Sequence, residues 1–449
     1  MNGTERGNWQ SQIGFVAAAA GSAVGLGNIW KFPYICGRYG GAAFVLVYLA
    51  IIILIGVPIM NSELLIGRKS ERNAVGAFKV LAPGTPWFIV GAMGILAGFI
   101  ILSYYSVVAG WAVAYIFKSG VYMAVGAEHA NIFVGSITSS VTPIIWHAIF
   151  MAMCIGIVAA GIEKGIEKYS KILMPTLVLL LLVLIIRSVT LPGAAKGLSF
   201  YLKPDFSKLT AEGILAALGQ AFFSLSLGMG CMIVYGSYLR KKEDIPINSY
   251  YIAGADTLIA FLAGFAIFPA VFAFGLEPGA GPGLTFITVP AVFAAMGPIG
   301  HFFGILFFFL LTIAALTSAI SLLEVVSAYF IDEAKWNRKK AVWIMGIIIF
   351  LLGIPSSLGL GAWSNVKILG GRDILDSLDF LASNILLPLG GFLLCIFIGW
   401  YWGTDKATEE ANIGAKSITL GSGYKFLIKY IVPVAIFIVF LNSIGVIKF

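Results

Sequence analysis

Two apolar stretches of the sequence carry glycines and small polar residues in their middles. The first is GSAVGLGN at residues 21–28, and the second is SLSLGMG at residues 224–230. Glycine inside a helix costs about 1 kcal/mol relative to alanine, so each cluster favours local unwinding. Unwound backbone inside a membrane offers carbonyl groups to cations, and the next half-helix can face an anionic group. The alternative is close helix packing through small residues, but Asn28 and the serines need polar partners that lipid does not supply.

A third polar feature is Asp256, which lies inside a long apolar run. A lone carboxylate at that depth is costly, so an ionisable residue there is by default a candidate functional residue. The alternative is a side chain that reaches to the cytoplasmic interface of the membrane.

The chain around these residues has the composition of a membrane protein. Of its 449 residues, 59% are hydrophobic and 11% are charged, whereas soluble domains carry about 25% charged residues. The net charge of +8 is spread over short clusters between apolar runs, which argues against a nucleic-acid partner. The four cysteines form no CxxC pair and no cluster with histidine, so neither a disulfide framework nor a zinc site is indicated.

Eleven apolar runs are long enough to cross a bilayer, which takes about 20 residues of helix. They are continuous rather than alternating, as expected of helices and not of a membrane β-barrel. The predicted spans are 13–35, 42–66, 88–117, 144–160, 172–189, 214–238, 250–274, 302–330, 341–354, 374–402 and 426–444. A shorter apolar run at 285–296 is predicted to be a loop helix that does not cross.

Lysine and arginine predict the orientation of these spans. Nineteen of them lie on one predicted side and nine on the other, with Lys31 inside the first span. The positive-inside rule then places the N-terminus in the cytoplasm and the C-terminus outside the cell membrane. The first span lacks the small-residue cleavage site of a signal peptide, so we expect it to be a mature helix.

The two glycine clusters lie in spans 1 and 6, and each of these spans begins a set of five. Because five is odd, the second set must enter the membrane in the opposite sense. We therefore predict an all-α transporter domain over 1–449, with inverted repeats at 10–190 and 213–402 and an additional helix at 424–445. In such transporters the broken helices of the two repeats meet at the middle of the membrane.

Several long motifs resemble those of the neurotransmitter:sodium symporters, which have the leucine-transporter-type fold. They are Arg6-x-x-Trp9, GSAVGLGNIWKFPY at 21–34, GQAFFSLSLGMG at 219–230, ALTSAISLLE at 315–324 and DSLDF at 376–380. The resemblance covers nearly the whole chain. Eleven spans and an aspartate at 256 make the chain similar to the bacterial branch that carries hydrophobic and aromatic amino acids.

The resemblance implies two sodium sites made of oxygen ligands, which suit an alkali cation. The first uses the substrate carboxylate together with the Ala23 carbonyl, Asn28, Ser224 and Asp256. The second uses the carbonyls of Gly21, Val24 and Ala314 with the hydroxyls of Thr317 and Ser318. Without the resemblance, such hydroxyls would be expected to bond back to their own helix.

The resemblance also implies a site for a neutral amino acid, with its carboxylate at the N-terminus of a half-helix. The carboxylate would meet the N–H groups of Leu26 and Gly27 and the Tyr105 hydroxyl. The ammonium would meet the carbonyls of Ala23, Phe223 and Ser226. The substrate side chain would lie in a pocket lined by Ile101, Tyr105, Phe223, Met229, Ser318 and Leu322. Family members that carry monoamines have an acidic residue at the position of Gly25. We therefore expect the substrate to bring its own carboxylate.

Two gates follow from the same resemblance. The outer gate would pair Lys31 with Asp379 above Phe223 and Tyr105, and the inner gate would pair Arg6 with Asp332 above Trp9, near Tyr238. The family usually has arginine at position 31. Lysine lacks the planar two-pronged contact of arginine, so we expect a looser or water-bridged outer gate.

The segment from Gly165 to Pro175 resembles the part of the family's fifth span that unwinds on the cytoplasmic side. A simple proline kink is the alternative interpretation.

A chloride requirement is not expected. Chloride-dependent relatives hold the anion beside sodium with side chains that match Tyr48, Gln220 and Ser224 here. In this chain Asp256 would supply the negative charge instead, because one anionic group close to a buried sodium ion offsets the repulsion between two cations.

These observations favour a symporter that couples sodium entry to uptake of a neutral hydrophobic or aromatic amino acid by alternating access. Its expected partners are the amino acid and the lipid bilayer, and the sequence does not specify an oligomeric state. One alternative is a proton-coupled amino-acid carrier of the same fold, and another is a non-transporting amino-acid sensor. The chain has no HExxH, GxSxG or Walker A motif, so we do not expect an enzyme.

Overall fold

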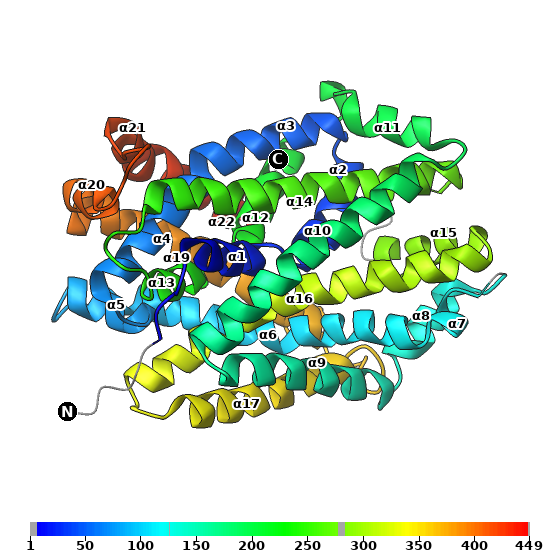
Figure 1. The fold of residues 1–449 in the computed structure, drawn as a ribbon, viewed down its shortest axis with the longest axis horizontal. Coiled ribbons are helices and arrows are strands. Elements are labelled where there is room, and N and C mark those ends of the chain that lie inside the picture. The colour runs from blue at the N-terminus through cyan, green and yellow to red at the C-terminus, as the bar shows by residue number, and fades with distance from the viewer. Residues whose placement is uncertain (1–6, 125, 277–282, 448–449) are drawn as a thin grey trace.

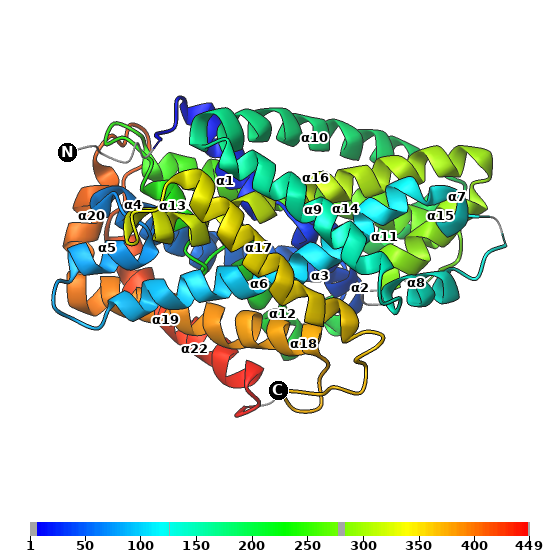
Figure 2. The same ribbon diagram turned by 90° about the horizontal axis from the view of Figure 1, so that it is seen from below.

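A computed structural model describes residues 7–124, 126–276 and 283–447, and every regular element in these ranges is a helix. The long helices run roughly side by side along the longest axis of the molecule (Figures 1 and 2). In the described ranges, nine helices are long and apolar enough to cross a membrane, and one bent helix pair would make a tenth span. The predicted all-α membrane fold is confirmed.

The nine uninterrupted helices follow the predicted spans with one main difference. The helix of the fifth predicted span begins at Ile162 rather than at residue 172. Charged residues lower the hydropathy of its first turns, but Ile162 and Ile166 are buried and attach these turns to the bundle. The helices are α3 (Ala42–Ile51) with η2 (Ile52–Gly56) and α4 (Val57–Ser70); α6 (Phe88–Phe117); α9 (Thr142–Ala159); η3 (Ile162–Glu167) with α10 (Lys168–Val189); α14 (Ile245–Ala273); α16 (Pro298–Asp332); α17 (Arg338–Leu358); α18 (Ile374–Asp379) with η6 (Phe380–Leu386), α19 (Leu387–Ile396) and η7 (Phe397–Trp402); and α21 (Ser422–Phe426) with η8 (Leu427–Ile431) and α22 (Val432–Ser443).

The first and sixth spans are interrupted at the two glycine clusters, as predicted. Helix α1 (Gln12–Ala23) is followed at an angle of 51° by η1 (Gly27–Lys31) and α2 (Phe32–Arg38). Helices α12 (Ala211–Ser224) and α13 (Cys231–Gly236) are separated by residues 225–230. Two glycines in that stretch have positive φ, which glycine adopts without steric cost.

The remaining helices lie between the spans. The apolar segment predicted at 285–296 is a loop helix, formed by η5 (Leu284–Thr288) and α15 (Val289–Ala295). The others are α5 (Ala74–Leu81), α7 (Ser119–Tyr122), α8 (His129–Ile137), α11 (Ala194–Leu202), η4 (Phe206–Lys208) and α20 (Thr404–Asn412).

Helices α4 and α13 approach each other closely at two glycines. A Cβ atom on Gly67 would lie 1.9 Å from the carbonyl oxygen of Ile233, and one on Gly236 would lie 2.5 Å from that of Leu64. Small residues at a membrane helix interface allow such backbone contact. The second span therefore fixes the position of the second half of the interrupted sixth span.

This contact predicts a strong effect of Gly67→Ala on stability. The added methyl group has no room against the α13 backbone, and overpacking of this kind costs about 1 to 3 kcal/mol. We expect a lower thermal unfolding temperature in nanodiscs. Gly156→Ala on α9 is the matched control, because nothing lies within 4 Å of the position of its Cβ. Equal unfolding temperatures for the two variants would contradict the proposed packing.

Candidate functional site

The unwound stretch after α1 is held by hydrogen bonds from inside the bundle. Val24 has an extended backbone, with φ −74° and ψ 106°. The Gly25 N–H donates to Asn28 Oδ1 at 3.0 Å, and the Leu26 N–H donates to the Tyr105 hydroxyl at 3.1 Å. The N–H groups released by the break thus have partners, while nearby carbonyl groups remain available to other ligands.

Three of the residues predicted for the first sodium site lie together. Asn28 Nδ2 donates to Asp256 Oδ1 at 2.7 Å and to Ser224 Oγ at 3.0 Å. Ser224 Oγ lies 2.9 Å from both carboxylate oxygens of Asp256. All three side chains are at most 1% exposed. Ala23, the fourth predicted ligand, lines the same small cavity as Ser224.

No lysine, arginine or histidine in the described ranges forms an ion pair with Asp256. Its carboxylate has only neutral hydrogen-bond donors around it, and a buried charge without a counter-charge is costly. An alkali cation bound to these oxygen atoms would remove that cost. The described residues also contain no group of three or more His, Cys, Asp or Glu side chains placed to hold a metal ion, so this oxygen set does not resemble a transition-metal site.

The residues predicted for the second sodium site also converge, between α1 and α16. The Ser318 hydroxyl lies 3.4 Å from the Gly21 carbonyl oxygen and 3.1 Å from that of Val24. The Thr317 hydroxyl lies 3.4 Å from the Val24 carbonyl oxygen and 3.0 Å from that of Ala314. The Thr317 hydroxyl also donates to the Ile313 carbonyl of its own helix. It thus makes the bond back to its helix and also faces the Val24 carbonyl.

A small cavity between the two oxygen clusters contains nearly all the residues predicted to bind the amino acid. Leu26 does not line this cavity, but its N–H donates a hydrogen bond to the hydroxyl of Tyr105, which does. The predicted residues that do line it are Ala23, Gly27, Ile101, Tyr105, Phe223, Ser226, Met229, Ser318 and Leu322.

Sequence reasoning missed a chain of hydroxyl groups at the edge of this cavity. Ser22 Oγ donates to Ser321 Oγ at 2.7 Å and lies 3.2 Å from Ser226 Oγ. Ser226 Oγ in turn donates to the Ser22 carbonyl at 2.8 Å. These bonds join the end of α1 and the unwound stretch at 225–230 to α16. The three-residue spacing between Ser318 and Ser321 places both on one helix face, which was the available signal.

A second buried carboxylate, also missed, supports the break in the sixth span. Glu63 is 1% exposed and accepts the Gly228 N–H at 2.7 Å. The argument applied to Asp256 would have selected it, because Glu63 also lies within a predicted span.

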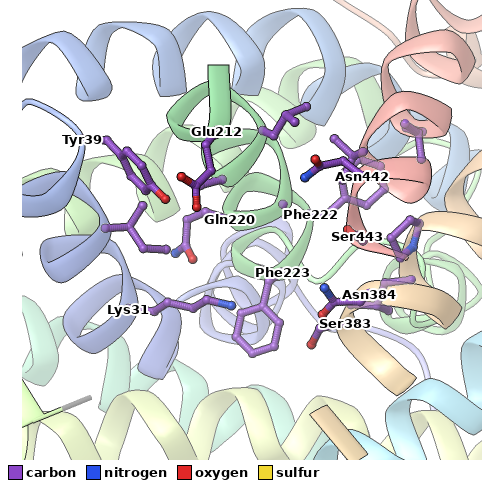
Figure 3. A pocket seen from close by; sticks show the side chains of 18 residues that line it. Lys31, Tyr39, Glu212, Gln220, Phe222, Phe223, Ser383, Asn384, Asn442 and Ser443 are labelled. Atoms are coloured by element: carbon purple, nitrogen blue, oxygen red, sulfur yellow. The ribbon is translucent and has the colours of Figure 1, made fainter. Parts of the chain in front are cut away.

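The predicted outer-gate residues do not form a direct ion pair. The Lys31 ammonium lies 5.1 Å from the centre of the Phe223 ring, within the range of a cation–π contact. Asp379 instead accepts hydrogen bonds from Tyr104 at 2.7 Å and from Ser383 at 2.8 Å. Figure 3 shows the Phe223 ring between Lys31 and Ser383, and all three residues line a cavity of 270 Å³. The flexible lysine stem lets the ammonium lie over the ring, and the phenol hydroxyl of Tyr104 takes its place at the carboxylate.

The described residues predicted for the inner gate include Trp9, which is buried. Its ring Nε1–H donates to the Tyr235 carbonyl at 3.0 Å, and the ring packs edge-on against Tyr235 and Tyr238. The Tyr238 hydroxyl donates to Glu324 at 2.6 Å. Asp332 accepts the Asn73 N–H at 2.8 Å, while Arg6, its predicted partner, lies outside the described residues.

The residues that match a chloride site are buried beside the first oxygen cluster. Gln220 Nε2 donates to the Gly27 carbonyl at 2.8 Å. The Gln220 Oε1 atom and the Tyr48 hydroxyl have no hydrogen-bond partner among the described residues. The Tyr48 hydroxyl lies beside the Ser224 side chain of the first oxygen cluster.

Comparison with known proteins gives a consistent result. Residues 6–124 and 129–449 match the model of the "Sodium:neurotransmitter symporter family". An uncharacterized sodium-dependent transporter of Bacillus subtilis is 43% identical over 98% of each chain. The crystal structure of MhsT in complex with L-phenylalanine is 50% identical, covers 98% of this chain and 100% of that one, and has a TM-score of 0.90. The human sodium- and chloride-dependent GABA transporter 2 is 28% identical over 90% of this chain and 74% of that one.

The cavity geometry predicts that Gly25→Ala weakens ligand binding. A Cβ atom there would lie 2.5 Å from the Ser318 hydroxyl and 2.8 Å from that of Tyr105. We expect binding of a radiolabelled amino acid to weaken about tenfold or more. Gly254→Ala, which has open space, is the control. Unchanged affinity in Gly25→Ala would exclude this cavity as the binding site.

Proposed function

The chain belongs to the sodium:neurotransmitter symporter family, and we propose that it couples the entry of two sodium ions to uptake of one neutral hydrophobic or aromatic amino acid. The proposal includes a position in the cell membrane with a cytoplasmic N-terminus and an external C-terminus. It also includes inverted repeats at 10–190 and 213–402, with residues 424–445 as an additional helix.

The buried Asp256 carboxylate carries the proposal. It has neutral donors from Asn28 and Ser224, and no basic side chain of the described ranges pairs with it. Sodium bound to Asp256, Asn28 and the Ala23 carbonyl would neutralise it. The same ion would bridge the first span to the seventh and, through the substrate carboxylate, contact the amino acid directly. Substrate and sodium would then stabilise the same closed arrangement.

The second oxygen cluster favours sodium over a proton as the coupling ion. It consists of carbonyl groups and of the Thr317 and Ser318 hydroxyls, none of which gains a proton near neutral pH. Such neutral oxygen atoms bind an alkali cation well. Asp256 alone would suffice for a proton-coupled carrier, so the second cluster would then have no function. The non-transporting sensor would need neither the cavity toward the outside nor an inner gate.

The amino-acid class follows from the cavity. At the N-terminus of η1, the Leu26 and Gly27 N–H groups and the Tyr105 hydroxyl offer donors to a carboxylate. Gly25 adds no acidic group of its own, so a substrate without a carboxylate would bring no anionic acceptor to the Gly27 N–H and the Tyr105 hydroxyl. Met229, beside Gly228 and Gly230, is unbranched and adaptable, which favours large apolar side chains. The complex of MhsT with L-phenylalanine supports this class.

Uptake of L-phenylalanine into proteoliposomes tests the proposed coupling. We expect an inward sodium gradient to drive accumulation with a Hill coefficient approaching two, and the double variant Thr317→Ala and Ser318→Ala to abolish it. Thr312→Ala on the same helix is the control, because its hydroxyl bonds only to its own helix. Undiminished uptake by the double variant with potassium as the cation would instead indicate proton coupling.

Chloride independence is a separate prediction that depends on Asp256. Wild-type uptake should not change when gluconate replaces chloride. Asp256→Asn removes the fixed negative charge, so its uptake should respond to added chloride, as in chloride-dependent relatives. A second change, Tyr48→Phe, removes the unpartnered hydroxyl and should abolish that response. Loss of wild-type uptake in gluconate would show that the carboxylate does not replace the anion.

A further inference from the structure

The N-terminal end of α1 is attached to the fifth span by one carboxylate. Glu167 accepts the Gln10 N–H at 2.9 Å and the Ser11 hydroxyl at 3.0 Å, and it pairs with Lys171 at 2.6 Å. Glu167 is only 1% exposed. The carboxylate thus accepts one hydrogen bond from a backbone N–H and one from the hydroxyl of Ser11 at the beginning of α1. The helix dipole favours a negative charge at this end.

The two elements fit together at a glycine. Ser11 is the N-cap of α1 and accepts the Gly14 N–H at 3.0 Å. A Cβ atom on Gly14 would lie 2.0 Å from a Glu167 oxygen. Any larger residue at position 14 would therefore push the carboxylate away from the helix end. The absence of a side chain at Gly14 is what permits the contact.

Glu167 is the last residue of η3, a short π-helical segment at the cytoplasmic end of the fifth span. The segment starts after Gly161, which has a φ of +98°. A Cβ on Gly165 would lie 2.1 Å from the Ile157 carbonyl oxygen, so this turn packs directly on α9. π-Helical turns are rare and frequently occur at functional sites. Glu163, in the same turn, is exposed.

The other end of α1 supplies the second oxygen cluster. Gly21 contributes a carbonyl there, and its backbone packs near Thr317 and Met174 of α10. On its other sides, the cytoplasmic end of α1 is held by Trp9 on α13 and by Gln12, which bonds Asn248 on α14 at 2.7 Å. Figure 1 shows α1 between α10 and α13. A tilt of α1 that opens the cytoplasmic side would break the bonds to Glu167.

We propose that Glu167 is a positioning residue that holds the cytoplasmic end of α1 on the fifth span while sodium is bound, and that its release opens the exit path of the second sodium ion. This inference rests on the proposed function. Glu167 touches neither ion nor substrate. It acts by favouring the arrangement in which the Gly21 and Val24 carbonyls face Thr317 and Ser318, so its loss lowers the apparent sodium affinity through a shift in population.

A purely structural ion pair between Glu167 and Lys171 is the competing interpretation. It predicts a loss of thermal stability with no change in the sodium dependence of binding. The proposal predicts a change in sodium dependence and a local change at the beginning of α1.

The test uses the full chain in nanodiscs with two variants and two controls. Glu167→Gln removes the charge but keeps the shape, and Gly14→Ala displaces the carboxylate without changing it. Glu163→Gln, exposed in the same turn, and Gly156→Ala, which has open space, are the matched controls. Hydrogen exchange of the amides in residues 8–14 is measured by mass spectrometry with and without sodium. The sodium concentration for half-maximal binding of L-phenylalanine is measured for each variant.

We expect both test variants to exchange these amides about tenfold faster in sodium, and to need about three- to tenfold more sodium for half-maximal binding. Affinity for L-phenylalanine at saturating sodium should stay within about twofold of wild type. The controls should match wild type in all measurements.

Unchanged exchange in Glu167→Gln and Gly14→Ala would overturn the inference, and so would faster exchange with an unchanged sodium requirement. If wild-type binding does not depend on sodium, the proposed function fails instead. In that case hydrogen exchange alone tests the contact between Glu167 and α1. If the amides of residues 8–14 exchange as slowly in both test variants as in wild type, the contact does not hold α1 in place.

Discussion

Unwound backbone in the middle of the membrane is the constraint on which the rest of this structure depends. Two helices break at residues 24–26 and 225–230, where lipid offers no hydrogen bonds. Partners therefore come from neighbouring spans. Tyr105 accepts the Leu26 N–H, and Glu63 accepts the Gly228 N–H. Because the N–H groups are satisfied in this way, the carbonyl groups of the first break are left to face the hydroxyls of α16.

The same constraint accounts for the residues that the proposed ion and substrate sites share. Ser318 lies at the second oxygen cluster and also lines the cavity, and Ser224 lies at the first cluster and lines it too. Ser22 then links both breaks to Ser321. A ligand at any one of these positions would stabilise the arrangement that the others need, which is the physical basis of coupled binding.

Much of this organisation could be predicted from the sequence, because glycine clusters and polar side chains inside a membrane span are costly and are seldom found without a structural or binding role. The spans and both breaks are examples, whereas the grouping of Asn28, Ser224 and Asp256 is expected only from the resemblance to the symporter family. The hydropathy pattern places the start of the fifth helix too late, since its buried isoleucines alternate with charged residues. Lys31 does not pair with Asp379 because the Tyr104 hydroxyl already donates a hydrogen bond to that carboxylate. The sequence pattern does not show which side chain will occupy this position. The contact of Glu167 with Gln10 joins distant parts of the chain, and no local pattern indicates it.

The central claim is that the buried Asp256 carboxylate and the neutral oxygen cluster each take up one sodium ion with each amino acid. A dual-label flux experiment tests it most directly, with radioactive sodium and tritiated L-phenylalanine entering the same proteoliposomes at zero membrane potential. The account predicts two sodium ions for each phenylalanine in the wild type. Entry of phenylalanine without accompanying sodium would contradict it.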